Sequence, residues 1–523
     1  MNQTSNTSQE TPQSKQVQTL LEVLRHRGTT QQVDRAHQIY CNRDINFANI
    51  DAIGFDMDYT LAVYTQEAVD RLSVKLTLER LIEHRGYPED IMNIKPDPDF
   101  AIRGLAVDRH RGNILKLDSH RHVGMAYHGF RALTQDELDE YKREAIRFSG
   151  DRYALMDTLY ALPEAFLYAA LVDYCEKNDP AIEGLTWEKL YDDIRFSIDL
   201  AHRDGSFKKE IMANTADYIE RSELLALTLH RLRSSGKKLF LLTNSYPQYT
   251  EHLMTYLLDG MLPEYDNWRQ YFEVIVAGAS KPRFFTESNP FLLVDDETLE
   301  AGEPTEKLER GRMYQHGNLK NFIEWSKIPA DRTLYVGDHI YGDILRSRKT
   351  SAWRTVMIVQ EMASELNQSR ALHEDLSYLN EIEDEIARLT QEISQEQWVE
   401  RNIEPLMEQL HNEAAQQPEN APDCISPEEL AKLATKELRH SKDRMRRRRK
   451  ELLKSLLDAE QRVQRHFNPW WGLIFKMNNK NSIFGEQVED YACLYTSKVS
   501  NFVNYSPMHY FRAPRQPMPH EIF

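Results

Sequence analysis

The stretch "IGFDMDYTLAVY", Ile53 to Tyr64, places two aspartates, Asp56 and Asp58, directly after a short apolar run. Acidic side chains do not belong inside a buried strand, because an uncompensated charge is costly to remove from water. A turn of surface chain would explain both residues, and so would an active site at a strand end. Ligands of parallel α/β sheets bind outside the carboxyl ends of the strands, so the other strands must decide between these interpretations.

Three further apolar runs have the length and composition of buried parallel strands. They are "KLFLL" before Thr243, "FEVIVA" before Lys281 and "TLYV" before Gly337, with helix-like or loop-like sequence between them. This alternation predicts the α/β class with a parallel sheet. The interval between Asp56 and Lys238 is longer than a crossover needs, which predicts an inserted cap-like unit over the strand ends.

Composition divides the chain into six segments. The Ser/Thr/Gln/Asn-rich start predicts disorder. Two long, charged stretches of helical period flank "QQPENAPDCISP" and predict a helical hairpin, with Ser426 as N-cap and Pro427 as first helical residue. The expected segments are a disordered N-terminus (1–30), core with the first motif (31–75), cap-like insertion (76–225), core with the other motifs (226–375), charged helical hairpin (376–470) and a C-terminal segment packed on the core (471–523).

Overall composition restricts the class of protein. A chain of 523 residues with 41% hydrophobic and 28% charged residues is typical of a globular protein with more than one folded unit. The net charge, 65 − 82 = −17, argues against nucleic acid or an anionic membrane as a partner. The basic run Arg444 to Lys450 is flanked by acids within helical sequence, and we interpret it as a solvated or intersubunit helix face rather than an RNA-binding patch.

Cysteine usage and apolar patterning predict a cytoplasmic location. The four cysteines have no paired spacing, as expected in a reducing compartment rather than in a disulfide framework or zinc cluster. The first sixteen residues contain no apolar segment of a secretory signal, and no apolar run is long enough to span a membrane.

Polar residues of defined chemistry follow each predicted strand. One carboxylate of the Asp56 and Asp58 pair could attack a phosphoryl group while the other protonates the leaving oxygen. Thr243, with Asn244 and Ser245 beside it, and Lys281 supply a hydroxyl, backbone N–H groups and a cation for phosphoryl oxygens. Asp338 and Asp343 supply carboxylates for Mg²⁺, although Asp343 in "GDIL" fits a helix start equally well.

In this order the four strand ends resemble the motifs of the haloacid-dehalogenase superfamily of phosphohydrolases. "GFDMDYTLAVY", "TNS", "KPRFF", "GDHIYGDILRSRK" and the C-terminal "YFRA" and "MPHE" are similar to the cytosolic purine 5′-nucleotidases, the inosinate/guanylate-preferring type. The resemblance runs from about Tyr40 to the end and is weaker in the cap and the hairpin. It implies a Rossmann-like parallel sheet core with an inserted cap and a C-terminal charged hairpin.

The resemblance also implies roles for the residues at the strand ends. Asp56 would become the aspartyl-phosphate and Asp58 would be the general acid and base. Mg²⁺ would be held by Asp56, the backbone carbonyl of Asp58 and Asp338, with Asp343 supporting them. Transferred phosphate would be bound by Thr243 and Lys281, with Asn244 and Ser245 beside them.

Two further residue sets come from the resemblance alone. Around the purine nucleotide it places Tyr160, Arg195, Asp199, His202 and Lys208, while Arg203 stands where the family has a tyrosine. At a nucleotide effector site it places Arg147, Asp157, Tyr341, Lys349 and Gln487. Asp490 and Asp157 depart from the family pattern there, and their negative charges are unfavourable beside a polyphosphate.

Three functions remain open from the sequence. The first is Mg²⁺-dependent hydrolysis of purine nucleoside 5′-monophosphates, with nucleoside phosphotransferase activity, control by a nucleoside triphosphate and a homo-oligomeric, by resemblance tetrameric, assembly. The second is a phosphatase of the same superfamily that acts on a sugar phosphate or another small ester. The third is a scaffold that binds nucleic acid or a partner through the charged hairpin.

Overall fold

The computed structural model describes residues 33–143, 146–178, 182, 184–340, 352–415, 427–477 and 480–515. The chain divides into two compact units, a core unit of Met1–Leu366 with Leu473–Phe523 and a helical unit of Asn367–Gly472. Residues 1–30, Ser426 and three predicted site residues, Tyr341, Asp343 and Lys349, lie outside the described residues. In the described part, every helix is too short or too polar to cross a membrane.

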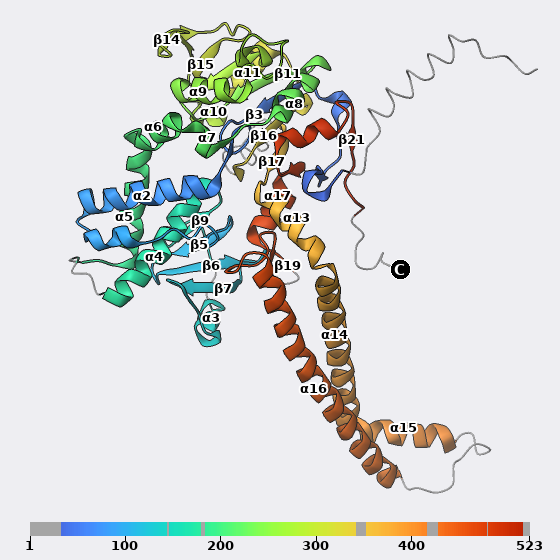
Figure 1. Cartoon of the computed structure of the whole chain (residues 1–523). Helices are drawn as coiled ribbons and strands as arrows, with labels where there is room; N and C mark the ends of the chain where they lie inside the picture. Colours follow the sequence, from blue (N-terminus) through green and yellow to red (C-terminus); the bar gives the residue numbers. More distant parts are fainter. Residues whose placement is uncertain are drawn as a thin grey trace, which may run out of the picture. The chain divides into compact units, whose positions relative to one another are not determined.

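The core unit is built on a ten-stranded sheet (Figure 1). Its strands, in spatial order, are β1 (Tyr40–Cys41), β20 (Leu494–Thr496), β17 (Arg354–Ile358), β16 (Thr333–Gly337), β3 (Ala52–Phe55), β11 (Lys238–Leu242), β12 (Val274–Ala277), β15 (Met313–His316), β13 (Phe291–Val294) and β14 (Ala301–Thr305). All neighbours from β20 to β15 are parallel. The four predicted strands are β3, β11, β12 and β16, which confirms the predicted α/β class with a parallel sheet.

Strand β3, which directly precedes Asp56, lies at the centre of this sheet. Parallel neighbours β11 and β16 flank β3, so that Gly54 lies opposite both Phe240 and Tyr335. A Cβ atom at Gly54 would lie 2.2 Å from the Phe240 ring and 2.8 Å from the Tyr335 ring. Glycine is therefore required here by close approach of two aromatic side chains, which lean across β3 from either side.

The central strands β3, β12 and β16 are buried at every residue, as expected for parallel strands covered on both faces. One cluster joins Ala52, Phe240, Val274 and neighbouring sheet residues to aromatic residues of the helices, as the two-residue period of a strand requires. The helices of the sheet region are α8 (Glu223–Ser234), α9 (Pro247–Leu258), α10 (Arg283–Thr286), α11 (Leu319–Ser326), α13 (Glu361–Ala371) and α17 (Ile483–Tyr491). Short strand pairs complete it: β2 (Ile45–Asn46) with β21 (Tyr510–Phe511), β4 (Val63–Tyr64) with β10 (Ile219–Glu220), and β18 (Lys476–Met477) with β19 (Lys480–Asn481).

The long interval between β3 and β11 contains a second, antiparallel sheet. Its strands, in spatial order, are β8 (Arg131–Ala132), β7 (Val123–His128), β6 (Asn113–Leu117), β5 (Leu105–Asp108) and β9 (Tyr153–Met156). The helices that accompany this sheet in the interval are α2 (Gln66–Arg85), α3 (Gln135–Tyr141), α4 (Leu162–Asn178), α5 (Trp187–Arg203), α6 (Ser206–Ala213) and α7 (Thr215–Tyr218), and α2 packs against α5 and α4. The sequence predicted an insertion here but not that it contains a sheet.

The helical unit consists of α14 (His373–Arg401), α15 (Ile403–Ala415) and α16 (Pro427–His466). Helices α14 and α16 run side by side (Figure 1) and bury Ile382, Leu389 and Leu452 between them. Helix α16 is described from Pro427 onwards, and the predicted helix start with Ser426 as N-cap stays a prediction. The basic run Arg444 to Lys450 lies within this helix, whose ion pairs include one from Arg448 to Glu385 on α14.

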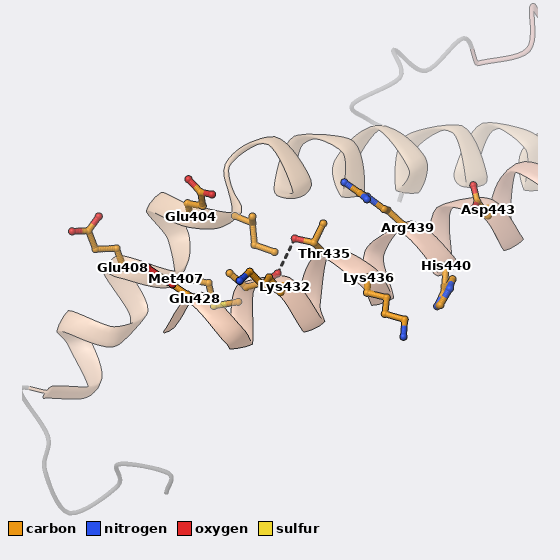
Figure 2. A pocket seen from close by; sticks show the side chains of 12 residues that line it. Glu404, Met407, Glu408, Glu428, Lys432, Thr435, Lys436, Arg439, His440 and Asp443 are labelled. Carbon is orange, nitrogen blue, oxygen red and sulfur yellow. Dashed lines mark hydrogen bonds between the residues drawn. The ribbon is translucent and has the colours of Figure 1, made fainter. Parts of the chain in front are cut away.

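A groove of about 990 Å³ lies between α15 and α16 of the helical unit (Figure 2). Its α15 wall carries Glu404 and Glu408, and its α16 wall carries Lys432, Lys436 and Arg439. None of the site residues predicted from the sequence lines this groove. The candidate chemistry lies instead at the strand ends of the core unit.

Candidate active site

The carboxylate of Asp56 is held in place at the end of β3. Its backbone N–H donates to the Val336 carbonyl of β16 over 2.9 Å, which continues the ladder between the two strands. Its Oδ1 accepts from the Met57 N–H at 2.8 Å and lies 2.9 Å from Nζ of Lys281. The residue is 8% exposed. A buried carboxylate is thus fixed by a backbone donor and compensated by a lysine.

Lys281 is itself placed by residues from three strands. Its Nζ also donates to the hydroxyl of Tyr335 at 3.0 Å, and that hydroxyl donates to the Leu242 carbonyl at 3.0 Å. Gly54 leaves the space in which the Tyr335 ring lies across β3. The Asn244 amide brackets the Lys281 backbone, accepting from its N–H at 2.6 Å and donating to its carbonyl at 3.0 Å. The lysine is therefore a fixed cation beside Asp56.

Thr243 and Ser245 follow β11, the other neighbour of β3. The Thr243 N–H donates to the Val276 carbonyl at 2.9 Å, and its hydroxyl accepts from the Ser245 N–H at 3.1 Å. Both side chains are buried. The structure thus places the predicted hydroxyl and backbone N–H groups on the strand adjacent to Asp56.

The two carboxylate oxygens of Asp58 each accept a hydrogen bond from a hydroxyl. Tyr64 donates to Oδ1 at 2.6 Å, and Ser245 donates to Oδ2 at 2.7 Å. The Tyr64 hydroxyl also lies 3.0 Å from that of Tyr249 on α9. Burial and the charge of Asp58 raise the pKa of Tyr64 well above its usual value, so this phenol stays protonated and remains a donor. The orientation of Asp58 is therefore set from both sides.

Asp338 directly follows β16 and is 5% exposed. Because β16 is the parallel neighbour of β3, two buried carboxylates, Asp56 and Asp338, leave the sheet side by side. Lys281 pairs with Asp56, and a pair of carboxylates with a backbone carbonyl is a donor set that fits a hard divalent cation. Among the described residues no three His, Cys, Asp or Glu side chains form a ready metal cluster, and Asp343 lies outside them.

Three predicted substrate residues of the insertion contact residues around Asp58 or one another. The Lys208 Nζ donates to the Ser245 hydroxyl at 3.3 Å and lies 4.7 Å from the centroid of the Tyr249 ring. The Tyr160 ring meets the Tyr59 ring edge to face at 4.7 Å and the His202 ring at 5.9 Å. Burial and the charge of Lys208 lower the pKa of His202 to about 4, so this imidazole is neutral at pH 7.

The other two predicted substrate residues pair with each other. Helix α5 carries both Arg195 and Asp199, 3.4 Å apart across one turn, and Arg195 donates to buried Glu164 at 2.8 Å. His202 stands on the same helix face, three residues after Asp199. The exposed Arg203 donates to the backbone carbonyl of Asp199 at 3.3 Å.

The predicted effector residues that the structure describes lie in different surroundings. Arg147 is exposed, and Gln487 is buried on α17 with an Oε1 atom that lacks a hydrogen-bond partner in the described part. Burial raises the pKa of Asp157, and the charges of His339 and Arg103 act in the opposite direction. Asp490 is exposed, and Arg43 donates to its backbone carbonyl. The effector site stays a prediction.

Sequence reasoning missed three tyrosines of the site. Tyr64 and Tyr249 fix Asp58, and Tyr335 fixes Lys281. Only Tyr64 had a signal in the sequence, since it closes the same stretch as the two aspartates. Tyr335 was counted as one more apolar residue of a strand.

The amino-acid sequence is similar to those of 5′-nucleotidase proteins. Residues 39–523 match the profile of the 5′ nucleotidase family. A 5′-nucleotidase domain-containing protein of Dictyostelium discoideum is 30% identical over 520 residues, which cover 96% of this chain and 78% of that protein.

Solved structures give only distant similarities. A predicted phosphoglycolate phosphatase from Haemophilus somnus is 14% identical with a TM-score of 0.25, over 60% of this chain and 86% of that one. An archaeal β-phosphoglucomutase from Pyrococcus is 13% identical with a TM-score of 0.27, over 59% and 86%. TM-scores this low carry no argument. The family match spans nearly the whole chain, and on that ground the chain belongs to the 5′-nucleotidase family, whose enzymes hydrolyse the phosphate ester of nucleotides.

Proposed function

We propose that this enzyme hydrolyses purine nucleoside 5′-monophosphates of the inosinate and guanylate type through an aspartyl-phosphate on Asp56. One observation carries the proposal: the buried Asp56 carboxylate lies 2.9 Å from the Lys281 ammonium, at the centre of a parallel sheet. A nucleophile and a fixed cation at one strand end are what phosphoryl transfer needs.

The proposed reaction has two steps. A carboxylate oxygen of Asp56 attacks phosphorus, and the bond from phosphorus to the 5′ oxygen breaks as Asp58 protonates that oxygen. Lys281 and Thr243 contact the phosphoryl oxygens. Asp58, now a carboxylate, takes a proton from the water that attacks the aspartyl-phosphate, which releases phosphate and restores Asp56. The Tyr64 and Ser245 hydroxyls keep Asp58 oriented through both steps.

Mg²⁺ is the proposed cofactor. Asp56, the backbone carbonyl of Asp58 and Asp338 would hold it, with Asp343 as a supporting residue. When bound, it supplies positive charge that offsets the two carboxylates and the phosphate dianion. The pairing of β3 with β16 supports this assignment, because it brings the two aspartates to the same edge.

The purine preference is proposed from the cluster that surrounds Asp58. Tyr160 offers an aromatic face for stacking, and neutral His202 and Lys208 lie beside it. Asp199 on α5 can accept N–H bonds from a 6-oxopurine. A small sugar phosphate has no aromatic base to stack on Tyr160. The substrate test below therefore distinguishes a nucleotidase from a sugar-phosphate phosphatase.

The proposal extends to a second activity, an effector, an assembly and a location. An aspartyl-phosphate can pass phosphate to a nucleoside hydroxyl, so phosphotransferase activity is expected, and a nucleoside triphosphate effector is proposed from the sequence resemblance. A homo-oligomer is supported by exposed apolar side chains of the helical unit, Trp398, Leu453 and Leu457 among them. A cytoplasmic location is supported by the free thiols of Cys41, Cys175 and Cys493.

Phosphate release from a panel of nucleotides and sugar phosphates, with Mg²⁺, tests the proposal. Asp56→Asn should lose activity by a factor on the order of 10³ or more, because an amide cannot attack phosphorus. Asp51→Asn is the matched control: Asp51 precedes the same strand, pairs with Arg332 at the surface and should keep full activity. Full activity of Asp56→Asn would refute the mechanism, and equal rates on sugar phosphates would refute the purine preference.

A further inference from the structure

Gln360 and Glu361, which follow β17 and begin α13, are linked to both strand ends that carry the predicted metal-binding residues. Gln360 contacts one strand end directly, and Glu361 is linked to the other through Arg103. Gln360 donates from Nε2 to the backbone carbonyl of Tyr59, the residue after Asp58, at 3.1 Å. Glu361, the first residue of α13, accepts two hydrogen bonds from one guanidinium, that of Arg103, at 2.7 Å and 2.6 Å. One turn of chain thus reaches the first motif directly and the fourth motif through Arg103.

Arg103 is a buried cation whose guanidinium donates three hydrogen bonds and lies near an aromatic ring. Its side chain is 0% exposed, and Nη1 donates to the backbone carbonyl of Asp338 at 3.0 Å. The Phe484 ring lies 4.8 Å from the guanidinium carbon. A planar fork held by two bonds to one carboxylate cannot rotate freely, so the third donor has a fixed direction. That direction is the backbone of Asp338.

Helix α13 is anchored again one turn later. Glu365 accepts from the Ile474 N–H at 2.7 Å, and Lys116 of β6 donates to the Leu473 carbonyl at 2.5 Å. Glu361 and Glu365 are four residues apart and share one helix face. The Glu361 carboxylate that binds Arg103 therefore belongs to a helix turn that is hydrogen-bonded to other segments at both of its ends.

We propose that Arg103, held by Glu361, is a positioning residue that sets the place of Asp338, and that Gln360 does the same for the loop after Asp58. Mg²⁺ demands near-ideal octahedral geometry, so the two loops must keep a constant separation to bind it. This inference rests on the proposed function, because it assigns the metal to Asp56 and Asp338. Neither Arg103 nor Glu361 contacts the reacting atoms.

The test measures Mg²⁺ binding without substrate, by calorimetry and by the rise in unfolding temperature that Mg²⁺ causes. Arg103→Lys keeps the charge but loses the fork, and it should raise the Kd for Mg²⁺ by about tenfold, as outer-sphere changes at metal sites do. At saturating Mg²⁺ its KM for the nucleotide should equal that of wild type. Glu361→Gln, at a partly exposed position, should shift the Kd in the same direction by a smaller factor and serves if Arg103→Lys does not fold.

The matched control is Arg152→Lys. Arg152 also makes two bonds to one buried carboxylate, that of Asp108, at 3.1 Å and 2.9 Å, but within the antiparallel sheet. It should lose stability without any change in the Kd for Mg²⁺. An equal shift in both lysine variants, or none in Arg103→Lys and Glu361→Gln, would overturn the inference while leaving the proposed function intact. No binding of Mg²⁺ by wild type would overturn the metal proposal itself, and this inference with it.

Discussion

The strand-end site and the helical unit both contain ion pairs, but the pair in the strand-end site is buried and the pair in the helical unit is exposed to water. In the core, Lys281 is 3% exposed and pairs with Asp56, which comes from another strand. On α16, Arg448 is 54% exposed and pairs with Glu385 of the facing helix. Removing one partner in the core leaves a buried charge uncompensated, whereas water replaces the partner at the surface of the helices. Burial at the strand ends of the sheet, not the number of charges, marks the residues on which we expect activity to depend.

Among the variants that compare the two regions, the largest expected effect is that of Lys281→Met. The change removes the cation beside Asp56 and beside the transferred phosphate, and we expect kcat to fall by a factor on the order of 10³, or about 4 kcal/mol. Steady-state kinetics with saturating Mg²⁺ measures it.

The control for this variant is Lys442→Met in the helical unit. Lys442 is equally buried and pairs with Glu400, so its loss tests whether any buried lysine has this effect. It should destabilise the helical unit and leave kcat unchanged. A similar fall of kcat in both variants would break the distinction between the two regions.

The sequence predicted the elements of the site better than their contacts. The apolar runs before Asp56, Thr243 and Lys281 are long enough to predict strands, and a parallel sheet then brings their ends to one edge. Which residues touch could not be predicted, because Arg103 and Glu361 are 258 positions apart. No local pattern in the sequence indicates that these two side chains are in contact.

The antiparallel sheet of the insertion was hidden for a different reason. Its strands β5 and β6 contain Asp108 and Lys116, which interrupt the apolar pattern although both are buried. Asp108 is compensated by Arg152, and the Lys116 ammonium donates to a backbone carbonyl. Buried charges with partners elsewhere in the chain make a strand look like surface sequence.

Leu452→Ala tests how much the buried contacts between α14 and α16 contribute to the stability of the helical unit. Leu452 packs with Ile382 and Leu389 between α14 and α16, and truncation should cost about 3 kcal/mol through lost contacts and a cavity. The midpoint of urea unfolding, followed by circular dichroism, measures it. Leu453→Ala, one residue along and 47% exposed, should cost less than about 0.5 kcal/mol. Equal losses would contradict the packing of the two helices described above.

His202 gives a pH test of burial in the core. Its pKa is lowered from 6.5 to about 4, so the unfolded chain binds a proton between these pH values that the folded chain does not. Stability should therefore fall as the pH is lowered through this window. Between pH 7 and pH 4.5 wild type should lose about 2 kcal/mol more than His202→Gln, measured by urea unfolding. Parallel curves would show that the imidazole is open to water.

The smallest expected effect is that of Arg448→Ala. Its Nε lies 3.2 Å from the Glu385 carboxylate at an exposed site, and such pairs contribute about 0.5 kcal/mol or less. A double-mutant cycle with Glu385→Gln at low and high salt measures the coupling, which should vanish in salt. A coupling above about 1.5 kcal/mol that survives salt would mean that water does not reach this pair in solution. The face carrying Arg444 to Lys450 would then be covered by another copy of the chain, and the difference in burial between the two regions would disappear on assembly.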